Sequence, residues 1–225
     1  MCGLWGVCVC LSKRSYRTDQ QDTWRETSIN KKMVPGTAMR MQIILAGIGG
    51  QGILFSSKIF SELGLKLGLD IMGSETHGMS QRGGSVIAHL KLGKFLSPLI
   101  HTGAADLLYS FDEYETYRTL RFLRRGGICF ANLVSEDRID KRILNHLQKK
   151  EIIFRAYDAS GIASRLGSIR AANIALISYS LGSGLVPFRY DDLRDILEIV
   201  SRGKDLKRNL KAFDAGFEEG SRLKI

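Results

Sequence analysis

Apolar and polar positions along this chain follow two periods in turn. Residues 42–46 form a short apolar run that ends in glycines, which is typical of a buried strand entering a tight turn. Residues 53–67 then place apolar side chains at near-helical spacing, and Gly68 ends this predicted helix. Further short apolar runs predict strands at 69–73, 85–92, 105–111, 128–131 and 152–156.

Longer periodic stretches between and after these runs predict helices. Residues 112–124 have acids in the first turn and Arg124-Arg125 at the end, which complements the helix dipole. Further helices are predicted near 138–149 (charged), at 171–181 (apolar all round and buried), at 190–200 (amphipathic) and at 204–217. The alternation predicts a three-layer α/β/α sandwich with a Rossmann-like first βαβ unit. Its sheet is expected to be mixed but mostly parallel, because a loop without helical character precedes 85–92 and leaves that strand free to run antiparallel.

The first forty residues differ in kind from the rest. They contain both Trp residues and three of the four Cys. The apolar opening precedes Lys13-Arg14, which is the wrong order for a secretory signal, and it is too short to span a bilayer. We expect residues 1–40 to be a disordered extension and residues 41–225 to be one domain. One explanation for the extension is that natural translation starts at Met39 or Met41.

The net charge of +10 raises the question of nucleic acid. The cations are spread along the chain and are not interleaved with aromatic residues, so solvated basic faces or an acidic protein partner explain the charge better. No second Cys pair or His pair accompanies Cys8 and Cys10, so no metal site is predicted. Cys129 lies in an apolar run and is expected to pack as a small hydrophobic residue in a cytoplasmic protein.

A glycine-rich turn follows the first predicted strand. Its sequence, Gly47-Ile-Gly-Gly-Gln-Gly52, matches the dinucleotide-binding pattern, and Glu75 lies near where an acid would bind a ribose hydroxyl. Against this, Glu75 opens a polar loop rather than leading into a helix. Binding of NAD(P) or FAD, binding of another phosphate, and a purely structural turn all remain open for Gly47, Gly49, Gly50, Gln51 and Gly52.

The segment from Glu75 to Gly84 is the second candidate for chemistry. It combines one acid, one Arg, one His, a Gln and three glycines, and it shows neither helical nor strand periodicity. We interpret it as a shaped loop that presents polar groups to a ligand or a partner. Its Arg82 can pair bidentately with a carboxylate or a phosphate, or with Glu75 in the same loop.

Three segments together resemble the gamma-type catalytic subunits of 2-oxoacid:ferredoxin oxidoreductases. They are Gly47-Ile-Gly-Gly-Gln-Gly52, Ser74-Glu-Thr-His-Gly-Met-Ser-Gln-Arg-Gly-Gly-Ser-Val86 and Ser97-Pro-Leu-Ile100. Within that family, His77, Ser97–Ile100, Arg170-Ala-Ala-Asn173 and Asn209-Leu-Lys-Ala-Phe-Asp-Ala-Gly216 are most similar to the indolepyruvate branch. The resemblance extends from Met41 to about Gly220.

This resemblance implies a reaction that needs several components. An arylpyruvate would be oxidatively decarboxylated, with CoA accepting the acyl group and ferredoxin the electrons. Such chemistry needs thiamine diphosphate and iron–sulfur clusters. The chain has no Gly-Asp-Gly opening of a thiamine site and one Cys in its body, so we expect it to bind neither cofactor alone. A larger thiamine diphosphate and iron–sulfur subunit would then be the partner, with no nucleic acid and no membrane involved.

Candidate site residues follow from this interpretation. The catalytic candidates are Arg82, Gln81, Glu75 and His77, although a structural role for His77 is the more common one. We call the segment from Glu75 to Gly84 the interface loop. Its Gly78, Gly83 and Gly84 would let backbone N–H groups come close to a ligand. Met79 and Ser80 are further binding candidates of the loop, although anchoring the loop in apolar surroundings is the more common role for a residue such as Met79. Two other functions remain open: a stand-alone NAD(P)- or FAD-binding module, and the gamma subunit of a pyruvate or branched-chain 2-oxoacid oxidoreductase.

Overall fold

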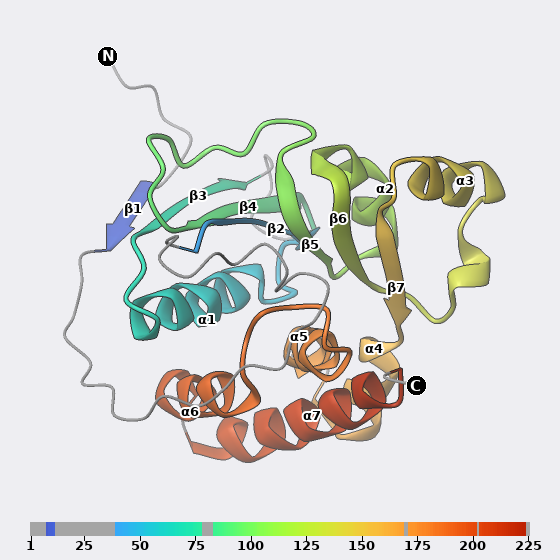
Figure 1. Ribbon diagram of the computed structural model, residues 1–225. Helices are drawn as coiled ribbons and strands as arrows, with labels where there is room; N and C mark the ends of the chain where they lie inside the picture. The colour runs from blue at the N-terminus through green and yellow to red at the C-terminus, as the bar shows by residue number, and fades with distance from the viewer. Residues whose placement is uncertain (1–7, 12–38, 78–82, 169–170, 202, 224–225) are drawn as a thin grey trace.

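The structure is a computed structural model that describes residues 8–11, 39–77, 83–168, 171–201 and 203–223 (Figure 1). Its strands are β1 (Cys8–Leu11), β2 (Met41–Ile48), β3 (Ile71–His77), β4 (Ser85–Leu92), β5 (Ala105–Ser110), β6 (Leu123–Asn132) and β7 (Ile153–Tyr157). Its α-helices are α1 (Ile53–Lys66), α2 (Glu113–Thr119), α3 (Lys141–Lys149), α4 (Ala159–Arg165), α5 (Ala172–Gly182), α6 (Tyr190–Val200) and α7 (Gly203–Ser221). Two short 3₁₀ turns lie at Leu120–Phe122 (η2) and Glu136–Arg138 (η3).

The strands form one mixed sheet in the order β1-β3-β4-β2-β5-β6-β7. The pairs on the β2-β5-β6-β7 side are parallel, whereas the β1-β3, β3-β4 and β4-β2 pairs are antiparallel. The prediction of a mixed α/β sheet is confirmed, and β4 is antiparallel as the sequence allowed. Among the described residues the sheet has three parallel and three antiparallel pairings.

The first βαβ unit is split. Strands β2 and β3 flank α1 in sequence, yet β4 lies between them and pairs with both. Because β4 is antiparallel to each, β2 and β3 run in the same direction without touching. In a nucleotide-binding unit of the Rossmann type these two strands are adjacent or separated only by parallel strands. The hairpin partner β4 therefore changes the surroundings of the glycine turn.

Two local predictions were wrong. The helix expected over 112–124 ends at Thr119, and β6 already begins at Leu123. The hydroxyls of Thr116 and Thr119 bond back to the carbonyls of Asp112 and Glu115, at 2.8 and 2.6 Å, and the chain tightens into η2 instead of continuing. Arg124 to Gly127 then form a bulge at the point where the β5-β6 register shifts.

Apolar side chains on the two faces of the sheet make two cores. Alternate residues of β2 separate them, since Ile43 and Leu45 pack with α1, α5, α6 and α7, whereas Ile44 and Ala46 pack with the α2–α3 side. Figure 1 shows α1, α5, α6 and α7 below the sheet, with α2 and α3 on its other side. The predicted three-layer arrangement is confirmed.

Helix α5 forms the centre of the larger layer. Every residue from Asn173 to Gly182 is buried, as the all-round apolar pattern predicted. The sequence prediction missed α4 and also β1, which pairs with β3 at the edge of the sheet. Cys129 is fully buried and free, and this burial raises the pKa of its thiol. No helix in the described residues is long and apolar enough to cross a membrane.

Candidate functional site

The glycine turn connects β2 to α1 at the carboxyl end of the parallel strands. The side chain of Gln51 folds back into the turn, where its Oε1 accepts a hydrogen bond from the Ile48 N–H at 2.8 Å. A Cβ on Gly47 would lie 2.6 Å from that oxygen and 2.7 Å from Ile53. Gly47 is therefore required for packing, and the Oε1 of Gln51 stabilises the turn from within.

The second half of the turn is open. Gly50 has φ of +100°, and a Cβ there would meet no atom within 4 Å. Gly52 caps α1 with φ of +80° and without a side-chain hydrogen bond. The positive end of the α1 dipole therefore lies next to Gly50, and Gly52 provides no side chain to cap its N–H groups.

Asn173 joins the first turns of α5 and α1 across 121 residues of sequence. Its amide nitrogen donates to the Gly52 carbonyl at 3.0 Å and to Ser56 Oγ at 3.1 Å, and its side chain is buried. On the neighbouring helices, Asn209 of α7 donates to Ser201 Oγ at 2.9 Å, just after α6. Asn173 thus ties α5 to the glycine turn, and Asn209 ties α7 to the end of α6.

A pocket of about 280 Å³ opens where these helices meet the turn. Its wall combines glycine backbone, amides, hydroxyls and two apolar side chains with one carboxylate: Gly50, Gly52, Phe55, Ser168, Asn173, Val200, Ser201, Asp205 and Asn209. Hydrogen-bonding groups beside an apolar floor suit an elongated ligand that carries both amide and apolar parts. Sequence reasoning placed only the turn here and missed the other walls. The segments that contain Asn173 and Asn209 were noted for their resemblance alone.

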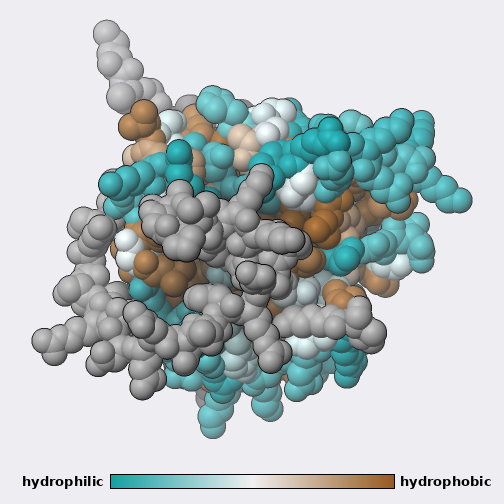
Figure 2. Space-filling view, in the orientation of Figure 1, coloured by the Kyte–Doolittle hydropathy of each residue, from teal (hydrophilic) through white to brown (hydrophobic). Residues whose placement is uncertain are grey.

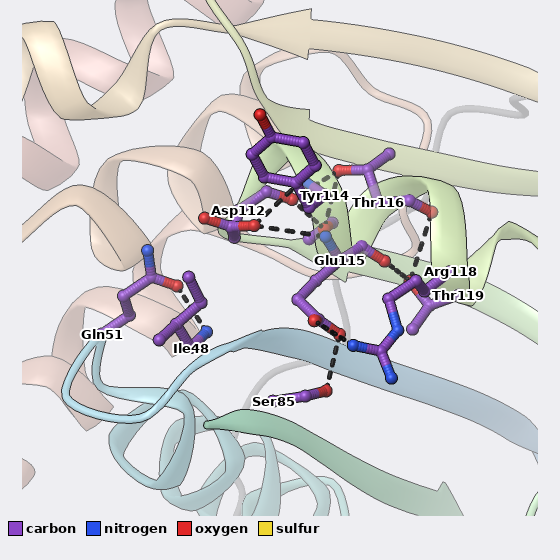
Figure 3. A network of polar contacts seen from close by, with 10 residues as sticks. Ile48, Gln51, Ser85, Asp112, Tyr114, Glu115, Thr116, Arg118 and Thr119 are labelled. Carbon is purple, nitrogen blue, oxygen red and sulfur yellow. Dashed lines mark hydrogen bonds and ion pairs between the residues drawn. The ribbon is translucent and has the colours of Figure 1, made fainter. Parts of the chain in front are cut away.

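The interface loop ends beside this turn. The Gly49 N–H donates to the Gly84 carbonyl at 2.8 Å, so the two predicted segments are in contact. Next to Gly84, Ser85 donates to the buried carboxylate of Glu115 at 2.7 Å, and Arg118 approaches the same carboxylate at 3.1 Å (Figure 3). The end of the loop is thereby fixed to both the glycine turn and α2, and no sequence pattern indicated the role of Glu115.

The description of Glu75–Gly84 as a loop without strand character was partly wrong. Glu75, Thr76 and His77 extend β3, in register with Ala88, Ile87 and Val86 of β4. A strand partner can extend a polar segment because backbone hydrogen bonds do not depend on side-chain pattern. Gly83 has φ of +82° and precedes β4 with Gly84. The candidates Gly78, Met79, Ser80, Gln81 and Arg82 lie outside the described residues.

Metal binding is the remaining question about the site. Among the described residues there is no group of three or more His, Cys, Asp or Glu side chains that could hold a metal ion. The one described cysteine of the body, Cys129, is buried in the sheet away from the turn.

The fold is an α/β domain whose first βαβ unit is split by β4, with a glycine turn at the carboxyl end of its parallel strands. Residues 42–219 match the pyruvate ferredoxin/flavodoxin oxidoreductase family, and the chain belongs to that family. It is 30% identical to the indolepyruvate oxidoreductase subunit IorB of Archaeoglobus fulgidus, over 80% of this chain and 96% of the relative. The IorB of Pyrococcus horikoshii is 28% identical over the same shares.

Solved structures show the same fold at lower identity. The gamma subunit of a keto/oxoacid ferredoxin oxidoreductase from Geobacter sulfurreducens matches with a TM-score of 0.63 and 19% identity, over 81% of this chain and 99% of that one. The 2-oxoglutarate:ferredoxin oxidoreductase of Magnetococcus marinus, with 2-oxoglutarate, coenzyme A and succinyl-CoA bound, matches with a TM-score of 0.66 and 20% identity. That match covers 82% of this chain and 31% of the other.

Proposed function

We propose that this chain is the smaller, cofactor-free subunit of a cytoplasmic, heteromeric oxidoreductase. The complex would decarboxylate an indolepyruvate-like arylpyruvate oxidatively, transfer the acyl group to CoA and pass electrons to ferredoxin. The observation that carries the proposal is the family match over 42–219 together with 30% identity across 96% of an IorB subunit. Thiamine diphosphate and iron–sulfur clusters would lie on a larger partner subunit.

The choice of an arylpyruvate rests on the relatives. Ketoisovalerate and pyruvate/ketoisovalerate oxidoreductase subunits also match, at 27% and 23% identity, and four IorB subunits match at 28–30%. The alternative of a stand-alone dinucleotide-binding module has less support. Strand β4 separates β3 from β2, Glu75 lies within the β3-β4 pair, and the Gln51 side chain fills the inside of the turn.

Within the complex, the pocket beside Gly50 would receive part of CoA, and the interface loop would complete the active site with the larger subunit. The pocket has amide and hydroxyl groups for the pantetheine amides and apolar Phe55 for its methylenes. The α1 N-terminus next to Gly50 favours a phosphate. Arg82 remains our candidate for a carboxylate or phosphate contact in the loop.

Two adjacent residues of α6 allow a matched test. Val200 lines the pocket, whereas Ile199 is 62% exposed and does not. In the reconstituted complex, Val200→Phe should raise the KM for CoA about tenfold with kcat changed less, and Ile199→Phe should leave both values unchanged. Equal KM values for the two variants would contradict the assignment of the pocket.

The subunit assignment itself is tested by assembly. The isolated chain should show no 2-oxoacid-dependent reduction of ferredoxin, and activity should appear when the larger subunit is added. Arg82→Ala should lower turnover by at least about tenfold if its charge acts in the site, with the exposed Arg165→Ala as control. Tight NAD(P)H binding by the isolated chain, measured by calorimetry, would support the dinucleotide alternative instead.

A further inference from the structure

The positive charge of the body is concentrated in one stretch of sequence. Residues 41–225 contain 26 Lys/Arg and 20 Asp/Glu, and residues 118–150 alone contain nine Lys/Arg and three Asp/Glu. The whole surplus of six positive charges therefore comes from this stretch, and the rest of the body is balanced. This stretch runs from the end of α2 through β6 to the end of α3.

Tertiary structure gathers much of this charge at the edge of the sheet opposite the glycine turn. Strands β5, β6 and β7 begin there: the Gly103 N–H bonds to the Arg121 carbonyl, and the Gly126 N–H bonds to the Lys150 carbonyl, each at 3.0 Å. Arg40 joins them from the residue before β2. We call this surface the basic edge, and define it as Arg40, Arg121, Arg124, Arg125, Lys149 and Lys150. Figure 2 shows the hydrophilic surface that covers the α3 side of this edge, at the upper right.

Only part of this charge is neutralised locally. Arg124 pairs with Asp106, and Arg125 pairs with Glu151. No ion pair is found among the described residues for Arg121, Lys149 or Lys150. The buried Lys91 also lies near this positive charge. Its pKa is lowered mainly by burial and, to a smaller extent, by the positive charge of Arg40. An edge with this excess attracts an acidic surface and repels a basic one.

An apolar projection lies beside Arg40 of the basic edge. The segment 93–104 crosses the outer face of β4, where the Ile100 N–H bonds to His89 Nδ1 at 3.2 Å. In this segment Leu96 is fully exposed and Leu99 is 49% exposed. Arg40 lies 4.4 Å from the centroid of the Phe95 ring at one end of the segment. Exposed leucines flanked by cations have the composition of a protein interface, with an apolar centre and a charged rim.

Nucleic acid is a poorer occupant of this surface. Binding of single strands uses exposed aromatic faces on which bases stack. The two aromatic rings nearest the edge already have cations over them, Arg40 and Lys91 at Phe95 and Arg121 at Phe122. The leucines would also remain in water against a phosphate backbone.

We propose that the basic edge, together with Leu96 and Leu99, is a docking surface for an acidic face of the larger subunit. This inference rests on the proposed function, and it assigns the partner a second contact, distinct from the glycine-turn edge. The exposed leucines indicate a permanently bound subunit rather than a transiently bound carrier, because a permanent partner would keep them buried for the lifetime of the complex.

Charge reversal tests the docking surface directly. The dissociation constant between this chain and the larger subunit of its complex is measured by surface plasmon resonance, from about 50 to about 500 mM NaCl. Arg121→Glu with Lys150→Glu should raise Kd at least about tenfold at low salt, and less at high salt. The control, Lys207→Glu with Lys211→Glu on exposed positions of α7, should change Kd less than about twofold. Leu96→Ser with Leu99→Ser should raise Kd at every salt concentration.

The outcomes separate this inference from the proposed function. If the complex forms and the reversed variant binds within about twofold of wild type, the docking surface is refuted and the subunit assignment stands. If wild type does not bind the larger subunit, both are refuted. Tighter binding of single-stranded RNA than of the subunit, lost in the reversed variant, would assign the edge to nucleic acid instead. Unchanged melting temperatures show that the variants are folded.

Discussion

Buried polar side chains show how single residues shape this structure. Tyr109 is fully buried, and its hydroxyl shares a hydrogen bond of 2.7 Å with Ser180 Oγ, which links β5 to α5. The buried hydroxyl of Tyr157 has no hydrogen-bond partner among the described residues, although its ring stacks on Tyr179 at 4.4 Å. A buried tyrosine hydroxyl therefore stabilises the fold at position 109, where it is hydrogen-bonded, and destabilises it at position 157, where no described residue is bonded to it.

Removing each hydroxyl should change stability in opposite directions. Tyr109→Phe loses a buried hydrogen bond and should lower the free energy of unfolding by about 1 kcal/mol. Tyr157→Phe removes an unsatisfied buried hydroxyl and should raise it by roughly 0.5 to 1 kcal/mol. Urea unfolding of the two variants beside wild type measures both changes. A loss of stability in Tyr157→Phe would show that its hydroxyl has a partner.

His89 should make stability depend on pH. Burial first and the Lys91 charge second lower its pKa to about 4, from an ordinary 6.5. Between pH 4 and pH 6.5 the unfolded chain binds a proton at His89 that the folded protein does not. The contribution of His89 to the free energy of unfolding is therefore complete above pH 6.5 and is lost as the pH falls toward 4. The loss amounts to roughly 3 kcal/mol.

An asparagine at position 89 separates this effect from that of the carboxylates. His89→Asn retains an acceptor for the Ile100 N–H but does not titrate. Denaturant unfolding at several pH values should therefore show wild type losing roughly 3 kcal/mol more than the variant between pH 7 and pH 4. Parallel profiles would mean that His89 titrates normally in the folded protein.

At the scale of elements, the packing of α5 on α7 decides the shape of the larger layer. Three glycines allow the two helices to approach backbone to backbone. A Cβ on Gly182 would meet the Phe217 carbonyl, one on Gly216 the Ala175 carbonyl, and one on Gly220 the Tyr179 carbonyl. Gly216 belongs to a segment noted for its resemblance to a functional family, and its visible role here is helix packing.

Alanine at these glycines should reverse the usual effect of helix propensity. On an exposed helix, Gly→Ala stabilises by about 0.5 to 1 kcal/mol. Gly216→Ala and Gly220→Ala should instead each destabilise by roughly 1 to 3 kcal/mol, because the backbones must move apart. Glu218→Ala, at an exposed position of the same helix, is the control and should change stability by less than about 0.5 kcal/mol. Thermal or denaturant unfolding would detect the difference. If Gly216→Ala or Gly220→Ala were more stable than wild type, the close packing of α5 on α7 would be contradicted.

At the scale of the whole molecule, the sheet separates two surfaces. Its glycine-turn edge carries the pocket and the ends of the interface loop, and the opposite edge carries the cations of the basic edge. Two cores, one on each face, hold these edges in place, and neither contains a described residue before Met39. We therefore expect residues 39 onward to be able to fold without the residues before them.

A chain that begins at Met39 should therefore fold. Deleting residues 1–38 removes the β1 pairing with β3, from Cys8↔Ser74 to Leu11↔Ile71, and leaves the described cores intact. We expect a melting temperature within about 4 °C of the full chain, equivalent to about 1–2 kcal/mol, and equal assembly with the larger subunit. Loss of the folded state on deletion would contradict our division of the chain at residue 40.

The sequence by itself determined the local elements whose patterns are strong. The apolar runs of β2 and β4, the amphipathic α6 and the buried α5 are encoded by side chains that need one face or all faces out of water, and that need has a fixed period. It also indicated the family, because the glycine turn and the segment around Arg82 together match that family's sequence pattern.

Tertiary structure decided what those segments contact. No local pattern indicates that β4 enters between β2 and β3, that Glu75 to His77 continue a strand, or that Asn173 bonds to Gly52 from 121 residues away. Hydrogen bonds between distant backbones, and pockets among three helices, depend on positions that only the packed cores fix. The cations were predicted to be spread along the chain, but nine of the 26 in the body lie within residues 118–150. Only the structure shows that several of these nine share one edge of the sheet.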